Sequence, residues 1–192
     1  MEDLSLKFAR LYKIISAESF LNKQALGGEI PFFIEPYQAR QELQVREAIK
    51  MLRNRLTNAG VSVLEINLYD TACEILEEKG GMERLFRVEK SKSKDKFLKA
   101  LQSSLNIHEV FIPKIADKIN AADARVYFIT GVGLVYPYIR SHNILNNLQR
   151  VAKEAPTVCF FPGEYDGISL KLFGRLKDDN YYRAFNIEKI EP

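Results

Sequence analysis

The chain has 192 residues, of which 46% are hydrophobic and 28% are charged, and its formal net charge is +3. No apolar run approaches the roughly 20 residues of a membrane helix, so we expect no membrane partner, and the charge is too small to demand a polyanionic partner by itself. The first residues are acidic and lack the cleavage site of a secretory signal, which favours a cytoplasmic protein.

Helix and strand patterns alternate in the first part of the chain. Apolar residues recur at helical spacing in three segments, residues 3–22, 38–59 and 71–79. Two apolar segments lie between these helices, residues 29–35 and 61–68, and both are typical of strands. The sequence therefore predicts helix, strand, helix, strand and helix in this order.

The middle of the chain is rich in basic residues. Residues 82–96 contain few apolar residues after Val88, which is typical of a solvated loop and helix face. The same segment could instead bind phosphates, because lysine and arginine neutralise them. Its candidate residues are Arg84, Arg87, Lys90, Lys92, Lys94 and Lys96. Helical spacing resumes over residues 97–105 and again over 110–119.

The region from Arg125 to Gly167 contains the most informative pattern of the sequence, and we expect it to form the centre of the fold. Two continuous apolar runs, 126–129 and 158–161, are typical of buried strands, and the segment between them has the spacing of one helix face. This order predicts a strand, a crossover helix and a parallel strand. Residues 169–187 then predict an antiparallel strand pair at the edge of the sheet, joined by a turn at 174–179.

The alternation of strands and helices predicts a single layered α/β domain over residues 1–192, with a central, mostly parallel sheet flanked by helices. Such a domain is similar to a P-loop NTPase core, but the sequence contains no GxxxxGK[ST] motif. A GxG at 131–133 is followed by Tyr136 where the motif GxGxxG needs its last glycine, and this side chain would obstruct a pyrophosphate. We therefore expect no nucleotide and no other cofactor.

Three acidic residues and two thiols are candidates for chemistry. Asp70 ends the segment INLYD as a Walker B carboxylate would, but without a phosphate cradle it is better explained as an N-cap or turn residue. Glu164 and Asp166 lie in the turn GEYDG, where they could bind the metal of a hydrolase or serve as ordinary turn residues. Cys73 and Cys159 lie in apolar patterns and are expected to be buried, reduced thiols.

Several segments together resemble one known family. They are GVGLVYPYIRSHNILNNL at 131–148, FFPGEYDG at 160–167, LKLFG at 170–174 and DDNYYRAFNI at 178–187, with EIPFFI and VLEINLYD before them. These segments are similar to the BrxB family, a core component of BREX bacteriophage-exclusion systems. The resemblance implies membership of a multi-gene locus that restricts phage while an adenine methyltransferase marks host DNA. It supplies no catalytic residues, and it implies an association with PglZ, the alkaline-phosphatase-like BREX component.

The resemblance favours a non-enzymatic adaptor that binds other BREX proteins. Its expected surface lies at the ends of the central strands and on the C-terminal edge, where tyrosine and arginine gather, the residue types that dominate interface energetics. The candidate interface residues are Tyr136, Tyr138, Arg140, Glu164, Tyr165, Asp166, Tyr181, Tyr182 and Arg183. Two alternatives stay open: a subunit that binds DNA through the basic patch and, ranked lowest, a metal-dependent hydrolase. Self-association is also compatible with the sequence.

Overall fold

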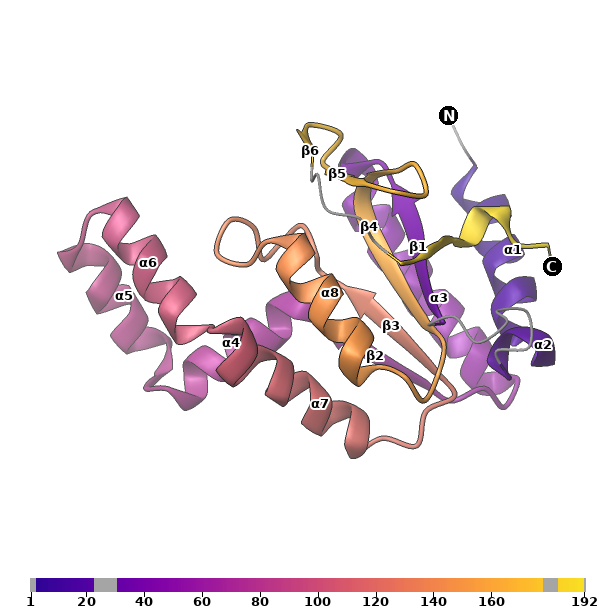
Figure 1. The fold of residues 1–192 in the computed structure, drawn as a ribbon, viewed down its shortest axis with the longest axis horizontal. Coiled ribbons are helices and arrows are strands. Elements are labelled where there is room, and N and C mark those ends of the chain that lie inside the picture. Colours follow the sequence, from indigo (N-terminus) through magenta and orange to yellow (C-terminus); the bar gives the residue numbers. More distant parts are fainter. Residues whose placement is uncertain (1–2, 23–30, 178–182, 192) are drawn as a thin grey trace.

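A computed structural model describes residues 3–22, 31–177 and 183–191 (Figure 1). Five parallel strands form the main sheet in the order β2-β3-β4-β1-β7, and two short strands extend it, β5 against β4 and β6 against β5. The strands are β1 (Phe32–Tyr37), β2 (Val63–Asn67), β3 (Val126–Thr130), β4 (Thr157–Tyr165), β5 (Leu170–Leu172), β6 (Leu176–Lys177) and β7 (Phe185–Asn186). The predicted α/β class with a mostly parallel central sheet is confirmed.

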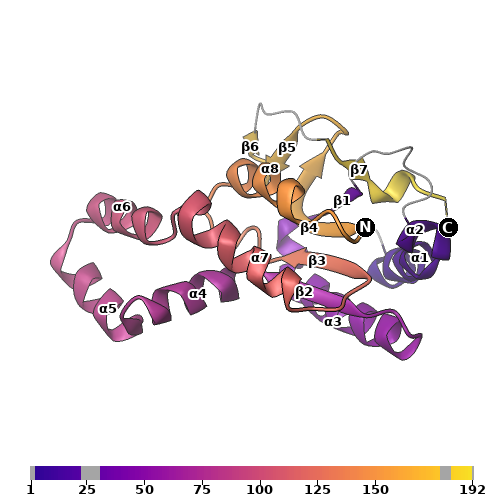
Figure 2. The ribbon, with the colours of Figure 1, turned by 60° about the horizontal axis from the view of Figure 1, so that its bottom comes forward.

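Helices cover both faces of the sheet (Figures 1 and 2). One face packs against α1 (Leu4–Ser16), α2 (Glu18–Leu21), α3 (Glu42–Asn58) and the 3₁₀ turn η4 (Ile187–Lys189). The other face packs against α4 (Leu68–Glu78), the π-helical turn η3 (Ile107–Phe111), α7 (Ile112–Asn120) and α8 (Ser141–Val151). Successive strand residues alternate between these two cores, so that Phe128 belongs to the first and Ile129 to the second.

The predicted unit of strand, crossover helix and parallel strand is confirmed. β3 and β4 are parallel neighbours in which Phe128 lies beside Val158, and α8 connects them. All five residues of β3 are buried, which is why this strand reads as an unbroken apolar run. β4 continues past the predicted end of its apolar run, because Gly163 has no side chain to collide with the Lys171 carbonyl of β5.

The C-terminal strand pair differs from the prediction. β5 pairs antiparallel with β4 and with β6, whereas β7 pairs in parallel with β1 on the opposite side of β4. The turn after β5 is tighter than expected, because Phe173 and Gly174 both take positive φ values, 57° and 66°, and reverse the chain within three residues. Part of the predicted second strand, residues 180–182, lies outside the described residues.

The basic segment forms more regular structure than expected. Residues predicted as a solvated loop and helix face belong to α5 (Gly81–Ser91), and α6 (Lys94–Ser104) follows after two residues. The spacing of Leu85 and Val88 explains the helix, because both lie on its apolar side. The two helices form a hairpin that projects away from the sheet (Figures 1 and 2), and no residue of either helix is buried.

Candidate functional site

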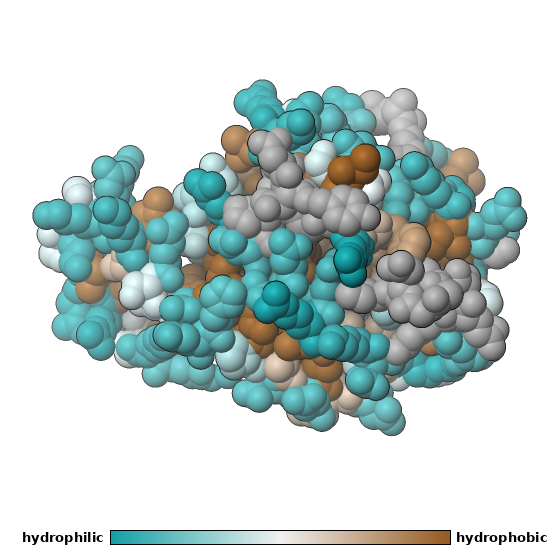
Figure 3. Space-filling view, viewed as in Figure 1, coloured by the Kyte–Doolittle hydropathy of each residue, from teal (hydrophilic) through white to brown (hydrophobic). Residues whose placement is uncertain are grey.

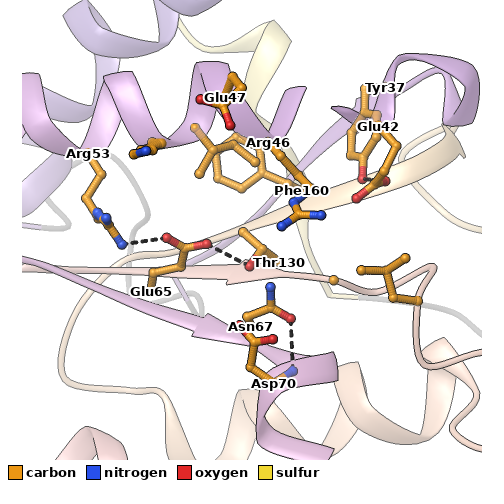
Figure 4. A pocket seen from close by; sticks show the side chains of 14 residues that line it. Tyr37, Glu42, Arg46, Glu47, Arg53, Glu65, Asn67, Asp70, Thr130 and Phe160 are labelled. Carbon is orange, nitrogen blue, oxygen red and sulfur yellow. Dashed lines mark hydrogen bonds and ion pairs between the residues drawn. The ribbon is translucent and has the colours of Figure 1, made fainter. Parts of the chain in front are cut away.

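A polar pocket of about 260 Å³ opens at the carboxyl ends of β2 and β3, beside α3 (Figure 4). At its wall, the Glu65 carboxylate accepts hydrogen bonds from Arg53 at 2.8 Å and from the Thr130 hydroxyl at 3.0 Å. Arg46 points into the pocket from α3, and Asp70 lies across from it. Ligands of parallel α/β domains bind at this edge of the sheet, so the pocket is the first place to look for chemistry.

The connection from β1 to α3 occupies the position at which a P-loop cradles phosphate. Residues 38–41 contain no glycine, and the lysine of the motif is also missing. Instead, the Tyr37 hydroxyl donates a hydrogen bond to Glu42 at 2.6 Å. Burial raises the pKa of Tyr37, and the Glu42 carboxylate raises it further, so the phenol stays protonated. This connection ties β1 to α3 and offers no phosphate cradle.

Gly131 has a structural role in this pocket. Its φ is +72°, and a side chain there would collide with Asn67 Oδ1. That oxygen accepts hydrogen bonds from the backbone N–H groups of Tyr69, at 2.9 Å, and Asp70, at 3.3 Å. Asn67 is therefore the N-cap of α4, and the expectation that Asp70 would cap this helix is wrong, because the helix begins three residues earlier than predicted.

Exposed apolar side chains gather beside this pocket, on the loop after β3 and on the turn after β5. Tyr136 and Phe173 meet edge to face with ring centroids 6.1 Å apart, although 38% and 37% of these residues stay exposed. Leu134 is exposed to a similar extent and also lines the pocket. Gly133 fixes the arrangement, because a Cβ there would lie 2.8 Å from the Phe173 ring. We call Leu134, Tyr136 and Phe173 the strand-end surface.

Phe173 is held in an uncommon backbone conformation. A positive φ is rare for a bulky residue and costs on the order of 1–3 kcal/mol. The backbone N–H of Phe173 donates to the Pro162 carbonyl at 2.8 Å, which anchors the turn to β4. The backbone of Phe173 is therefore strained, and its aromatic ring is partly exposed at the surface.

Known sequences similar to this chain identify its family. The sequence model for "BREX protein BrxB" matches residues 64–187, well over half of the chain. The chain belongs to the BrxB family. It is 42% identical over 177 residues to a BREX protein BrxB of Bacillus cereus (strain H3081.97), an alignment that covers 90% of this chain and 91% of that protein.

A second BrxB protein, from Escherichia coli O9:H4 (strain HS), is 31% identical over 184 residues, which cover 96% of this chain and 91% of that protein. No solved structure matches the chain. BrxB proteins belong to BREX phage-defence systems, so the chain is a component of such a system. The range matched by the family model includes the strand-end surface and the α5–α6 hairpin.

Most of the interface residues predicted from the sequence of this BrxB protein lie on the surface. Arg140, Glu164 and Arg183 are exposed, and Tyr138 is half-buried with its hydroxyl donating to the Leu134 carbonyl at 2.9 Å. Glu164 forms an exposed ion pair with Lys171 at 3.2 Å, and such a surface pair contributes little to stability. Tyr181 and Tyr182 lie outside the described residues. The sequence reasoning missed Leu134 and Phe173.

Two of the predicted interface residues have structural roles instead. Tyr165 is buried, and its hydroxyl donates to the Ala184 carbonyl at 2.8 Å. Asp166 accepts hydrogen bonds from the backbone N–H groups of Ser169 and Ile168 and from the Ser169 hydroxyl, and these bonds lower the pKa of its carboxyl. Asp166 therefore shapes a turn, which weakens the hydrolase alternative.

The six basic residues that were candidates for nucleic-acid binding are all exposed on the α5–α6 hairpin or between its helices. Residues 81–104 contain seven basic and three acidic side chains, a difference of four, whereas the whole chain carries +3. The excess positive charge of the protein is therefore concentrated on this hairpin. In Figure 3 the hairpin is mostly hydrophilic, with small hydrophobic patches between the polar side chains.

Two kinds of site are missing from the part of this BrxB chain that the structure describes. Within residues 3–22, 31–177 and 183–191, no group of three or more His, Cys, Asp or Glu side chains could hold a metal ion. None of the helices in the same ranges combines the length and the apolarity that crossing a bilayer requires. Cys159 is fully buried, and this burial raises the pKa of its thiol, whereas Cys73 is only half-buried, which differs from the expectation.

Proposed function

We propose that the chain is a non-catalytic adaptor of a BREX phage-defence system and that it binds another BREX protein, PglZ, through the strand-end surface. The observation that carries this proposal is the exposed pair of Tyr136 and Phe173 at the carboxyl ends of the strands. Aromatic residues at such positions contribute most of the free energy of binding in protein interfaces, because they combine large contact area with low conformational entropy.

The geometry of the strand-end surface supports a preformed interface. The Phe173 ring lies close to Gly133, and the backbone N–H of Phe173 is bonded to the Pro162 carbonyl, so the turn that carries the ring is anchored before a partner arrives. A rigid anchor loses little entropy on binding, and the strained backbone of Phe173 has no other evident use. Arg140 and Tyr138 come from the same loop and can supply polar contacts at the rim.

The test is copurification of tagged protein from cells that express the whole BREX locus. We expect PglZ to copurify with the wild-type chain, and we expect Tyr136→Ala and Phe173→Asn each to reduce the amount by about 10-fold or more, since truncating a hot-spot residue costs at least about 2 kcal/mol. Asparagine tolerates a positive φ, so Phe173→Asn removes the ring without adding backbone strain.

Met51→Ala is the matched control, because Met51 is a large, exposed apolar residue of α3 that does not line the pocket beside the strand-end surface. It should leave both copurification and phage defence unchanged. Thermal unfolding of all variants shows whether they are folded. A wild-type chain that emerges without PglZ contradicts the proposed partner, and unchanged copurification of both aromatic variants contradicts the proposed surface.

A second candidate function, binding of nucleic acid, is favoured by the concentration of positive charge on the hairpin. Arg87, Lys90, Lys94 and Lys96 are exposed there. Their contacts would be with phosphates, so binding to duplex DNA should weaken steeply with salt and show little sequence preference. A gel-shift titration measures this directly.

For this candidate, we expect a variant with both Arg87→Glu and Lys90→Glu to lose at least about 10-fold in affinity for DNA, because two phosphate contacts become repulsive. Lys189→Glu changes an exposed residue of η4, far from the hairpin in the sequence, and is the control. Absence of binding by the wild-type chain at low salt rules the candidate out. Equal losses in the two variants place the DNA contact elsewhere.

A further inference from the structure

The projecting hairpin contains a groove that the adaptor surface does not use. About 460 Å³ of space lies between α5, the end of α4 and α6. Its apolar lining consists of Leu76, Leu85, Val88 and Ala100, all of them only half-buried. No residue of α5 or α6 is buried, so these helices leave their apolar sides incompletely covered.

The rim of the groove is positively charged. Lys79, Arg84 and Lys92 line it, and the described residues that line it include no carboxylate. The Lys79 ammonium donates to the Ser104 carbonyl at 2.8 Å, which holds the end of α4 against the end of α6. Arg84 and Lys92 are exposed, so their charges face the solvent at the mouth of the groove.

We propose that this groove binds an acidic amphipathic helix of a partner protein. Apolar side chains spaced three or four residues apart on that helix would fill the groove, as helices do in other hydrophobic grooves. Carboxylates on its flanks would meet the cationic rim, and this complementarity would favour an acidic helix over a basic one. The site lies on the hairpin, whereas the strand-end surface lies on the loops after β3 and β5, so the groove is a second docking site.

The character of the groove lining favours a protein over a nucleic acid. Unpaired bases are held by stacking on aromatic side chains, whereas this lining is aliphatic. Phosphates need cations but no apolar floor. A groove of this volume suits several aliphatic side chains of a helix. The hairpin that carries the groove projects away from the sheet (Figure 2).

Site-specific photo-crosslinking tests the occupant of the groove. The photoreactive amino acid p-benzoylphenylalanine is placed at Val88 in one variant and at Ser104 in another, in cells that carry the whole BREX locus. The second variant covers the case in which the replacement of Val88 disturbs the hairpin. We expect both positions to crosslink a protein segment that is acidic and amphipathic. Leu43 is the control position, since it is 74% exposed on α3. Absence of crosslinks from both positions, or crosslinks only to nucleic acid or to segments without acidic residues, overturns the proposal.

A peptide with the crosslinked sequence then measures the role of the charged rim. By fluorescence anisotropy, Arg84→Glu combined with Lys92→Glu should weaken binding at least about 10-fold. Arg87→Glu combined with Lys90→Glu is the matched control, because these residues do not line the groove, and it should weaken binding about 2-fold or less. Equal losses in both double variants would show unspecific attraction and overturn the proposal.

The same crosslink separates this proposal from the adaptor surface. Tyr136→Ala should leave the crosslink at Val88 unchanged, because Val88 belongs to α5 and Tyr136 to the loop after β3. Loss of PglZ together with retention of this crosslink supports two independent sites. A variant of Tyr136 that abolishes the crosslink as well shows that the groove is not an independent site.

Discussion

Replacing Lys7 with methionine is expected to lower the free energy of unfolding by about 3–5 kcal/mol, because it removes the ammonium group that pairs with the buried Glu35 carboxylate. The Lys7 ammonium lies 2.5 Å from Glu35 and 2.7 Å from Glu188, and it also donates to the Pro36 carbonyl at 2.7 Å. Glu35 is 1% exposed, in the middle of β1. Urea denaturation measures the change.

Two further variants show whether the lost ion pair causes the loss of stability in Lys7→Met. Adding Glu35→Gln to Lys7→Met removes the uncompensated charge, so we expect the double variant to be more stable than Lys7→Met alone. Arg125→Ala breaks the exposed pair with Glu18 and should cost much less than Lys7→Met, because solvent screens this pair. Similar costs for the buried and the exposed pair would contradict this account.

Alkaline pH provides an independent measurement of the same interaction. Burial alone would lower the pKa of Lys7, but Glu35 and Glu188 outweigh burial and raise it from 10.5 to about 12. The stabilisation is therefore complete below pH 10.5 and is lost as the pH rises through about 12. Between these limits, the stability difference between the wild-type chain and Lys7→Met should shrink by roughly 2 kcal/mol.

Phe160→Ala is expected to cost about 3–5 kcal/mol, because it leaves a cavity where three aromatic rings meet. Phe160 is fully buried in β4, stacked on Phe8 of α1 at 6.2 Å and edge to face with Phe128 of β3 at 5.2 Å. The melting temperature should fall by roughly 6–20 °C. Thermal unfolding followed by circular dichroism measures the shift.

Phe86→Ala is the matched control for the aromatic core. Phe86 is 54% exposed on α5, so its removal creates no cavity and should change the free energy of unfolding by about 0.5 kcal/mol or less. A cost for Phe160→Ala below about 1 kcal/mol would mean that α1 does not pack on β4 as described.

The main sheet could be predicted because its signals are local. The apolar runs at 126–129 and 158–161 predict strands directly. Because these strands are buried on both faces, apolar residues occupy successive positions instead of alternating with polar ones. The pairing of β7 could not be read in this way. Phe185 and Asn186 pair with Phe33 and Ile34, which lie about 150 residues earlier in the sequence. A strand of two residues is too short for a periodic pattern that could predict this pairing.

The candidate site was predicted only in outline. Tyrosines near strand ends could be found from the sequence, but Tyr165 is buried and bonded to Ala184, 19 residues further along the chain, and no local pattern shows this. Phe173 carried a usable signal, an aromatic residue directly before a glycine in a turn, which indicates that the ring is held at a reversal of the chain. The groove on the hairpin depends on how two helices face each other, and this was not accessible from either helix alone.

The pairing of β7 with β1 has a consequence for synthesis of the protein. β1 ends at Tyr37 and β7 begins at Phe185, so a ribosome completes β1 long before it releases the strand that covers its edge. Until then, the nascent chain presents an unpaired strand edge beside Phe33 and Ile34, a surface on which other chains can add strands. Chains that stop before Phe185 should therefore aggregate or be degraded, and only translation through Asn186 supplies the strand that covers this edge of β1.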